Sequence, residues 1–235
     1  MIVLFALTGV LAGSGLNWLS HRLPRYAASR ITLKTAPFTI AVWQLLKACF
    51  ARRRLTSLTR TVWISATAEL ITAALFVGLG QHFGLSWAFL RLGAICCGLI
   101  LIALIDLHYR LVLNVLIYPA IGLTLIVRLT SPDTTPLVTL LGGAIGLSMF
   151  LLAALLRPGE LGGGDVKLAT LIGLMFGFPY VLWALLIGIV AGGAFAIGLM
   201  VRRHSRRLLI PYAPFLCLGA IIALLYNPLT VFFHL

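Results

Sequence analysis

The chain has 235 residues, of which 61% are hydrophobic and only 10% are charged. A water-soluble domain of this length cannot bury so many apolar side chains, so the composition excludes a soluble globular protein and indicates a membrane protein. The formal net charge is +13. An anionic membrane surface accounts for this charge, and no nucleic-acid partner is expected.

Apolar runs occur along the whole chain. A helix needs about 20 apolar residues to cross the hydrocarbon core of a bilayer. Runs of about this length predict helices at residues 1–19, 62–80, 87–107, 111–128, 136–156, 166–181, 182–200 and 208–226. The predicted fold class is therefore all-α: a polytopic transmembrane bundle of about eight helices.

The distribution of basic residues predicts the orientation of these helices. The first run lacks a basic segment before it, so it is expected to be a retained helix with its N-terminus outside. In that orientation sixteen of the eighteen Lys and Arg residues fall in cytoplasmic loops, as the positive-inside rule requires, and only Arg91 and Arg128 are expected outside. The domain prediction is a first transmembrane helix at 1–20, a basic cytoplasmic loop at 21–61 and a transmembrane core at 62–235.

The basic loop is the one long stretch expected outside the membrane. Its stretch 38–50 has the apolar spacing of an amphipathic helix that lies on the membrane surface. The four cysteines of the chain have no metal-ligand spacing, so neither a metal site nor a disulfide is expected.

Only five acidic residues occur in the chain, so each can be interpreted separately. Asp133 lies in a Ser-Pro-Asp turn that is expected outside, and Glu69 lies about two turns into a predicted helix. A carboxyl at that depth either bonds a neighbouring helix or belongs to a site. Asp106 ends one predicted helix, Asp165 opens another, and Glu160 precedes Asp165 in the same loop.

Asp106 and Asp165 are expected at the same membrane depth, because both lie at cytoplasmic helix ends. If they meet, like-charge repulsion prevents both from ionising, so the two carboxyls share a proton. One can then activate water while the other donates a proton, which is the chemistry of an aspartic peptidase. The alternative is that Asp165 only caps its helix.

The residues around Asp165 are candidates for supporting roles. Gly162, Gly163 and Gly164 are expected to permit unusual backbone angles and the close approach of an extended substrate. Lys167 is expected to face Glu160, a lipid head group or an acidic substrate residue.

These motifs resemble the type IV prepilin peptidase family. The resemblance rests on the Glu-Leu-Gly-Gly-Gly-Asp-Val-Lys-Leu run at 160–168 and on the Ile-Asp-Leu run around Asp106, with Pro119 downstream. It also includes the segment from Gly13 to Pro24 and the Pro-Tyr-Ala-Pro-Phe-Leu run at 211–216.

The resemblance implies a bacterial inner-membrane enzyme with Asp106 and Asp165 as its catalytic pair. It implies cleavage of prepilins or pseudopilins after a glycine that ends a short basic leader, at the cytoplasmic face. Such an enzyme would serve a type IV pilus or type II secretion system. It also implies methylation of the new N-terminal residue with S-adenosylmethionine as cofactor, and membrane lipids as further partners.

The sequence departs from the family in two places. The basic loop contains only Cys49, where many members have two Cys-x-x-Cys pairs, so a methylating subdomain would be degenerate and without zinc. Leu113 and Asn114 stand where the family usually has proline and aspartate. A peptidase without methyltransferase activity therefore remains an alternative.

Two other function classes remain as alternatives. A proton-coupled transporter would also place carboxyls in glycine-broken helices, although it would favour the middle of the bilayer. A structural assembly protein would need neither Asp106 nor Asp165.

Overall fold

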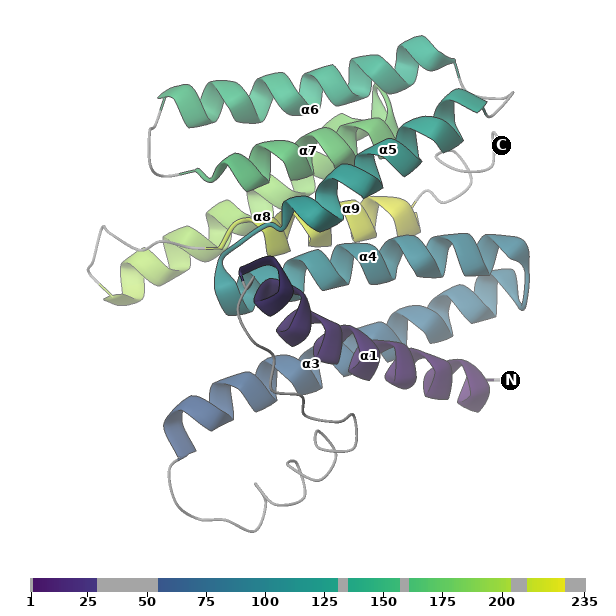
Figure 1. Ribbon diagram of the computed structural model, residues 1–235, viewed down its shortest axis with the longest axis vertical. Coiled ribbons are helices and arrows are strands. Elements are labelled where there is room, and N and C mark those ends of the chain that lie inside the picture. The colour runs from purple at the N-terminus through teal and green to yellow at the C-terminus, as the bar shows by residue number, and fades with distance from the viewer. Residues whose placement is uncertain (1, 29–54, 131–134, 157–160, 204–210, 227–235) are drawn as a thin grey trace. The chain divides into compact units, whose positions relative to one another are not determined.

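The computed structural model describes residues 2–28, 55–130, 135–156, 161–203 and 211–226. Every regular element among these residues is a helix, and the chain divides into one compact unit at residues 1–108 and a second at 109–235. Figure 1 shows the helices in chain order: α1 (Ile2–Ala28), α3 (Leu55–Phe83), α4 (Trp87–Tyr109), α5 (Asn114–Thr130), α6 (Pro136–Leu156), α7 (Gly163–Phe176), α8 (Tyr180–Arg203) and α9 (Ala213–Tyr226).

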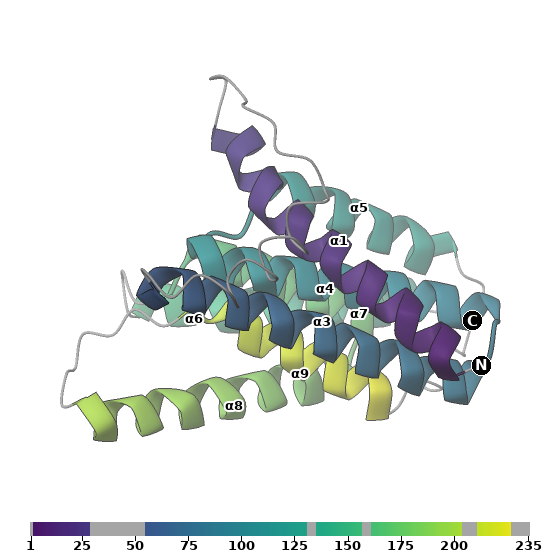
Figure 2. The same ribbon diagram turned by 90° about the horizontal axis from the view of Figure 1, so that it is seen from below.

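The first unit is built from α1, α3 and α4. Small residues let α1 approach α3 closely, since a Cβ atom added to Gly9 would lie 2.6 Å from the Cα of Ala73. Gly13, one turn later, faces the backbone of Glu69 in the same way. Two glycines spaced by four form the small-residue stripe that membrane helices use for packing. Figure 2 shows α1 crossing α3.

Aromatic rings pack together at the end of this unit where α1 and α4 begin and α3 ends. Phe89 of α4 packs with its ring centroid 5.2 Å from that of Phe5 and 5.6 Å from that of Phe76, the second pair edge-to-face. Such tilted contacts match the charge distribution of aromatic rings. They join all three helices of the unit.

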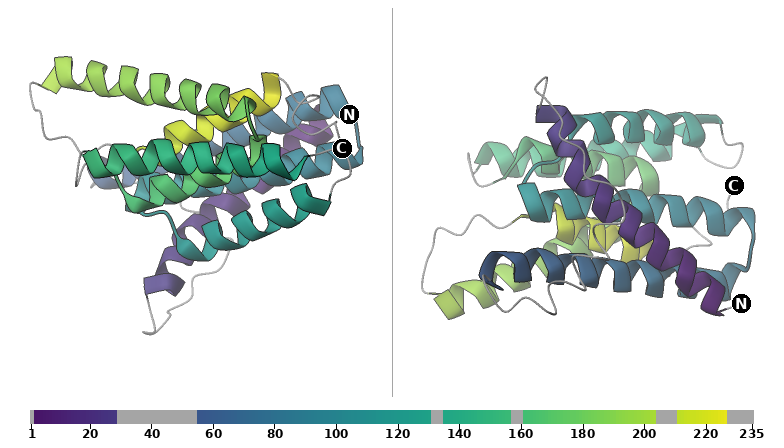
Figure 3. Two further views of the ribbon diagram at one scale, coloured as in Figure 1. Left: turned by 90° about the horizontal axis from the view of Figure 1, so that it is seen from above. Right: turned by 60° about the horizontal axis from the view of Figure 1, so that its bottom comes forward.

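The second unit is organised around α7, which is its most buried helix. Leu168, Ala169 and Ile172 have no exposed surface. Gly142 and Gly146 of α6 lie against carbonyl groups of α7, and Gly188 of α8 lies against Phe215 and Leu216 at the start of α9. Figure 3 shows α6 beside α7 and α8 beside α9. The glycines of α6 and α8 thus serve as packing surfaces for their neighbouring helices.

The structure confirms the all-α fold and the eight expected helices. Five of them, α1, α3, α4, α6 and α8, are long and apolar enough to cross a membrane. In contrast, α7 has 14 residues, about 21 Å at 1.5 Å per residue, and is shorter than the roughly 30 Å hydrocarbon core. A helix enclosed by protein need not match the bilayer thickness. The helix predicted at 166–181 lies at Gly163–Phe176, because Gly177, with φ 69°, and Pro179 end it before the predicted bound.

Several helix ends differ from the sequence prediction. Helix α1 continues to Ala28 and α3 begins at Leu55, so both extend into the segment expected as a loop. Hydropathy marks where a helix leaves the bilayer, whereas its hydrogen bonds continue beyond that point. The expected surface helix at 38–50, Cys49, Asp133 and Glu160 lie outside the described residues.

Candidate active site

Asp165 lies in the first turn of α7. Its carboxylate Oδ2 accepts a hydrogen bond from the backbone N–H of Gly162 at 3.3 Å, and its own N–H donates to the Gly162 carbonyl at 3.0 Å. A carboxylate is also favoured here by the positive end of the helix dipole. Asp165 is only 9% exposed. Asp165 therefore caps α7. Because the cap also fixes the position of the carboxylate, the capping role is compatible with catalysis.

The glycines before Asp165 differ from the expectation that they would adopt unusual backbone angles. Gly162 is extended, with φ −77° and ψ 144°, and Gly163 and Gly164 are already helical. The reason for glycine at 164 is close packing, because a Cβ added there would lie 2.6 Å from the Cβ of Val112. At Gly163 the same position is open, and Gly162 and Gly163 are both exposed.

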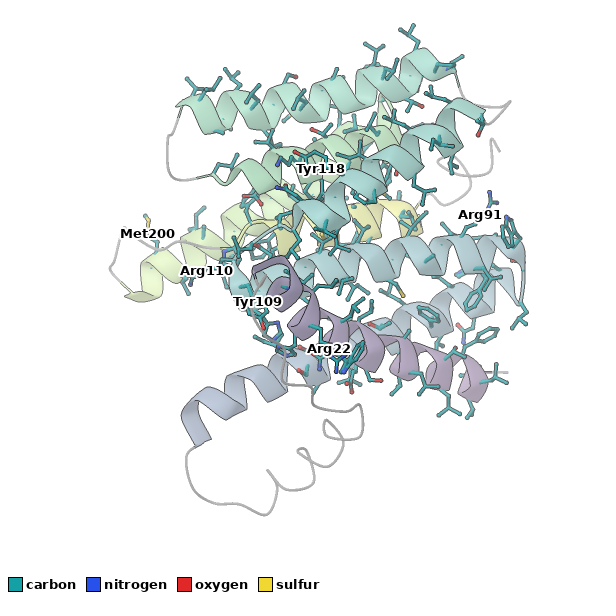
Figure 4. All side chains as sticks on the ribbon, viewed as in Figure 1. Arg22, Arg91, Tyr109, Arg110, Tyr118 and Met200 are labelled. Carbon is teal, nitrogen blue, oxygen red and sulfur yellow. The ribbon has the colours of Figure 1, made fainter. Side chains whose placement is uncertain are left out.

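Val112 belongs to the short connection between α4 and α5. Asn114 follows as the first residue of α5, and its Oδ1 accepts a hydrogen bond of 2.7 Å from the Nζ of Lys167. The same Nζ lies 4.9 Å from the ring centroid of Tyr118. Figure 4 shows Tyr118 on α5, which runs along α7. Among the described residues, Lys167 thus contacts α5; Glu160, one of its expected partners, lies outside them.

The opposite end of α7 is closed by Arg128 of α5. This arginine is 6% exposed, and its Nη2 donates a hydrogen bond of 3.2 Å to the Phe176 carbonyl. Gly177 follows with φ 69°, a left-handed conformation that glycine adopts without strain. The guanidinium group satisfies an end carbonyl and complements the negative end of the helix dipole.

Tyr212 precedes α9 and is half-buried. Burial raises the pKa of its phenol, and the nearby Asp165 carboxylate raises that pKa further. The backbone carbonyl of Tyr212 accepts hydrogen bonds from the N–H groups of Phe215 and Leu216. The Pro-Tyr-Ala-Pro run therefore brings a phenol into the electrostatic surroundings of Asp165.

Asp106 lies near the end of α4 and is only 5% exposed. Two residues later, His108 Nδ1 and the Leu104 carbonyl oxygen form a hydrogen bond of 2.8 Å, and the His108 ring meets that of His21 at 4.6 Å between centroids. Asp106 thus belongs to the first unit, near the end of α4 at which His108 contacts His21 of α1. Asp165 belongs to the second unit.

The sequence identified some of these residues and missed others. The second unit brings together Gly164, Asp165 and Lys167, as their spacing requires. Val112 and Tyr118 were not expected near them, because no motif connects residues that are about 50 positions apart. Glu69, which was expected either to bond a neighbouring helix or to belong to a site, lies beside Gly13 of α1, and both interpretations stay predictions.

Comparison with known proteins supports one family. Residues 93–197, which include Asp106 and Asp165, match the model of the type IV leader peptidase family. A prepilin leader peptidase/N-methyltransferase of Bacillus subtilis strain 168 is 30% identical over 177 residues, which cover 75% of this chain and 71% of that protein. A protein of the same name from Pseudomonas aeruginosa is 30% identical over 165 residues, or 68% of this chain and 57% of that protein.

No solved structure matches the chain. The assignment therefore rests on the sequence relatives, on the apolar helices and on the family match around both aspartates. With this identity and coverage, the chain belongs to the type IV leader peptidase family and is a multi-pass membrane peptidase.

Proposed function

We propose that this protein removes the short basic leader of type IV prepilins or pseudopilins after a glycine, at the cytoplasmic face of the bacterial inner membrane. Asp106 and Asp165 form its catalytic pair. The names of both relatives support prepilins as the substrate class. The distribution of Lys and Arg supports an N-terminus outside and a cytoplasmic site.

One observation carries the assignment of the catalytic pair. The chain that leaves Asp106 packs through Val112 against Gly164, the residue directly before Asp165. Val112 follows Asp106 by six residues, so the covalent chain limits their Cα separation to about 22 Å. The chain that continues from Asp106 is therefore packed beside Asp165, which supports the assignment of the two aspartates as a pair.

The proposed reaction uses one shared proton. The ionised carboxyl takes a proton from water as the water oxygen attacks the scissile carbonyl, and the protonated carboxyl stabilises the developing oxyanion. On collapse of the tetrahedral intermediate, the C–N bond breaks and the leaving amine takes a proton from the pair. Gly162 is exposed and extended, so its main chain is open to an extended substrate strand.

The proposal includes methylation of the new N-terminal amine. Both relatives are named N-methyltransferases, which supports S-adenosylmethionine as the methyl donor. The degenerate methylating subdomain predicted at 21–61 lies mostly outside the described residues, so no residue is assigned to this cofactor. Among the described residues no group of three or more His, Cys, Asp or Glu side chains could hold a metal. Because Cys49 lies outside that set, the absence of a metal stays a prediction.

The test is the mass of a candidate prepilin after incubation in liposomes with wild type, Asp106→Asn or Asp165→Asn protein. Each reaction is run with and without S-adenosylmethionine. We expect loss of the leader with wild type and no cleavage by either variant. A further methyl mass, dependent on S-adenosylmethionine, would establish the second activity.

Asp133→Asn is the matched control, because it removes a carboxylate from a loop predicted on the other side of the membrane. It should cleave like wild type. Cleavage by both Asp106→Asn and Asp165→Asn would refute the pair. An uncut substrate with wild type would instead favour the transporter alternative.

A further inference from the structure

One cation connects the N-terminal parts of α5 and α7. Lys167 Nζ donates a hydrogen bond of 2.7 Å to Asn114 Oδ1 and lies 4.9 Å from the centre of the Tyr118 ring. Lys167 is half-buried, whereas Asn114 and Tyr118 are exposed. The contact therefore lies at the edge of the second unit, directly beside the turn that holds Asp165.

Helix electrostatics alone do not favour this position. Asn114 is the first residue of α5, and the N-terminus of a helix carries partial positive charge, which disfavours a nearby ammonium group. A neutral side chain at 167 would avoid this cost. The specific partners compensate for it, because an amide oxygen accepts the ammonium proton and an aromatic face attracts the cation.

The connection between α4 and α5 is held at two neighbouring points. Val112 packs on Gly164. Leu113 is buried, and its backbone carbonyl accepts hydrogen bonds from the N–H groups of Leu116 and Ile117. Arg110, two residues before Val112, has φ 53°, an uncommon conformation for a residue with a side chain. The surrounding contacts must maintain this conformation.

We propose that Lys167 is a positioning residue that ties the start of α5 to the second turn of α7. This contact keeps the chain after Asp106 packed against Gly164. The inference rests on the proposed catalytic role of Asp106 and Asp165. Lys167 acts through Asn114 and Tyr118 on the placement of the connection and does not touch the reacting atoms.

Kinetics distinguish this role from the binding of substrate or lipid. A misplacement of about 1 Å at a site can lower the rate 100-fold, whereas loss of a binding contact raises KM. We expect Lys167→Met to lower kcat about tenfold and to change KM less than about twofold. Asn114→Leu should lower kcat in the same way but by no more than Lys167→Met, because Lys167→Met also removes the contact with Tyr118. The double variant should be no worse than Lys167→Met alone, because that variant already removes both contacts.

Two further variants complete the series. Lys167→Arg keeps a donor and a cation, so it should recover most of the lost kcat. Arg91→Met, the matched control, removes a positive charge from α4 and should cleave like wild type. Additive losses in the double variant, or a rise in KM with unchanged kcat, would overturn the proposal in favour of direct contact with substrate or head groups.

A second measurement does not depend on activity. In protein whose four cysteines are replaced by serine, Val112→Cys is labelled with a maleimide with and without Lys167→Met. We expect Lys167→Met to raise the labelling rate about threefold or more, the size expected when a small local opening becomes easier. Leu111→Cys is the control, since Leu111 is already 59% exposed and should label at the same rate in both.

The two measurements separate the two proposals. If Lys167→Met speeds the labelling of Val112→Cys but wild type does not cleave the prepilin, the positioning contact is supported and the proposed function is refuted. Unchanged labelling would overturn the positioning role even if wild type cleaves.

Discussion

At the scale of single residues, Gly164 is a position in the candidate active site at which a side chain cannot be accommodated without a shift of its neighbour. A Cβ there would lie 2.6 Å from Val112 Cβ, which is closer than real Cβ contacts. We expect Gly164→Ala to lower cleavage about tenfold or more by displacing the connection after Asp106. Steady-state cleavage of a prepilin in liposomes measures this.

Gly163→Ala is the internal control for that variant. The same added atom at Gly163 meets nothing within 4 Å, so activity should change little. Val112→Ala in the Gly164→Ala background should restore part of the loss. Equal losses at 163 and 164 would show that backbone freedom, not packing, requires glycine.

Tyr212 provides a pH-dependent test of its proximity to Asp165. Burial and then the Asp165 charge raise the pKa of Tyr212, so Asp165→Asn should lower it. A pH titration of phenolate absorbance, with Tyr212→Phe to identify the signal, measures the change. Asp133→Asn should leave the titration unaltered, and an unaltered titration in Asp165→Asn would contradict the proximity.

The raised pKa of Tyr212 also predicts how the stability of the folded protein changes with pH. A phenol with a raised pKa in the folded state contributes stability that is fully present below its unfolded pKa of about 10 and is lost as pH rises through the folded pKa. Tyr212→Phe should therefore lose less thermal stability than wild type in that alkaline range.

At the scale of elements, α7 is held at both ends by different chemistry. Asp165 caps its first turn, and Arg128 binds the Phe176 carbonyl at its last. Arg128→Met would leave a buried carbonyl without this donor, which costs about 1–3 kcal/mol. We expect a lower Tm in thermal unfolding of the detergent-solubilised protein.

Arg91→Met provides the comparison for Arg128→Met. It removes the other basic residue expected outside the cytoplasm, so it separates loss of charge from loss of the α7 contact. A Tm decrease of equal size in both variants would argue against a specific role of Arg128.

At the scale of the whole molecule, the predicted orientation can be measured directly. In cysteine-free protein, Ser131→Cys should react with a membrane-impermeant maleimide added to intact spheroplasts. Ser205→Cys should react only after the membrane is opened, because the basic residues around it are retained inside. The reverse pattern would place the proposed site outside the cytoplasm.

The sequence by itself determined the helices, the family and the two candidate aspartates. Residues 136–156 were predicted as a helix and form one with the same bounds, because a long apolar run in a bilayer must satisfy its backbone internally. Asp106 and Asp165 stood out because acidic residues are rare and costly in such a chain.

Tertiary structure decided which distant residues meet. Lys167 contacts Asn114 across 53 positions, and Arg128 contacts Phe176 across 48. No sequence period encodes such pairs, because they depend on how α5 packs along α7. The reason for glycine at 164 was also undecidable before packing was known: the backbone there is an ordinary helix, and the constraint comes from Val112.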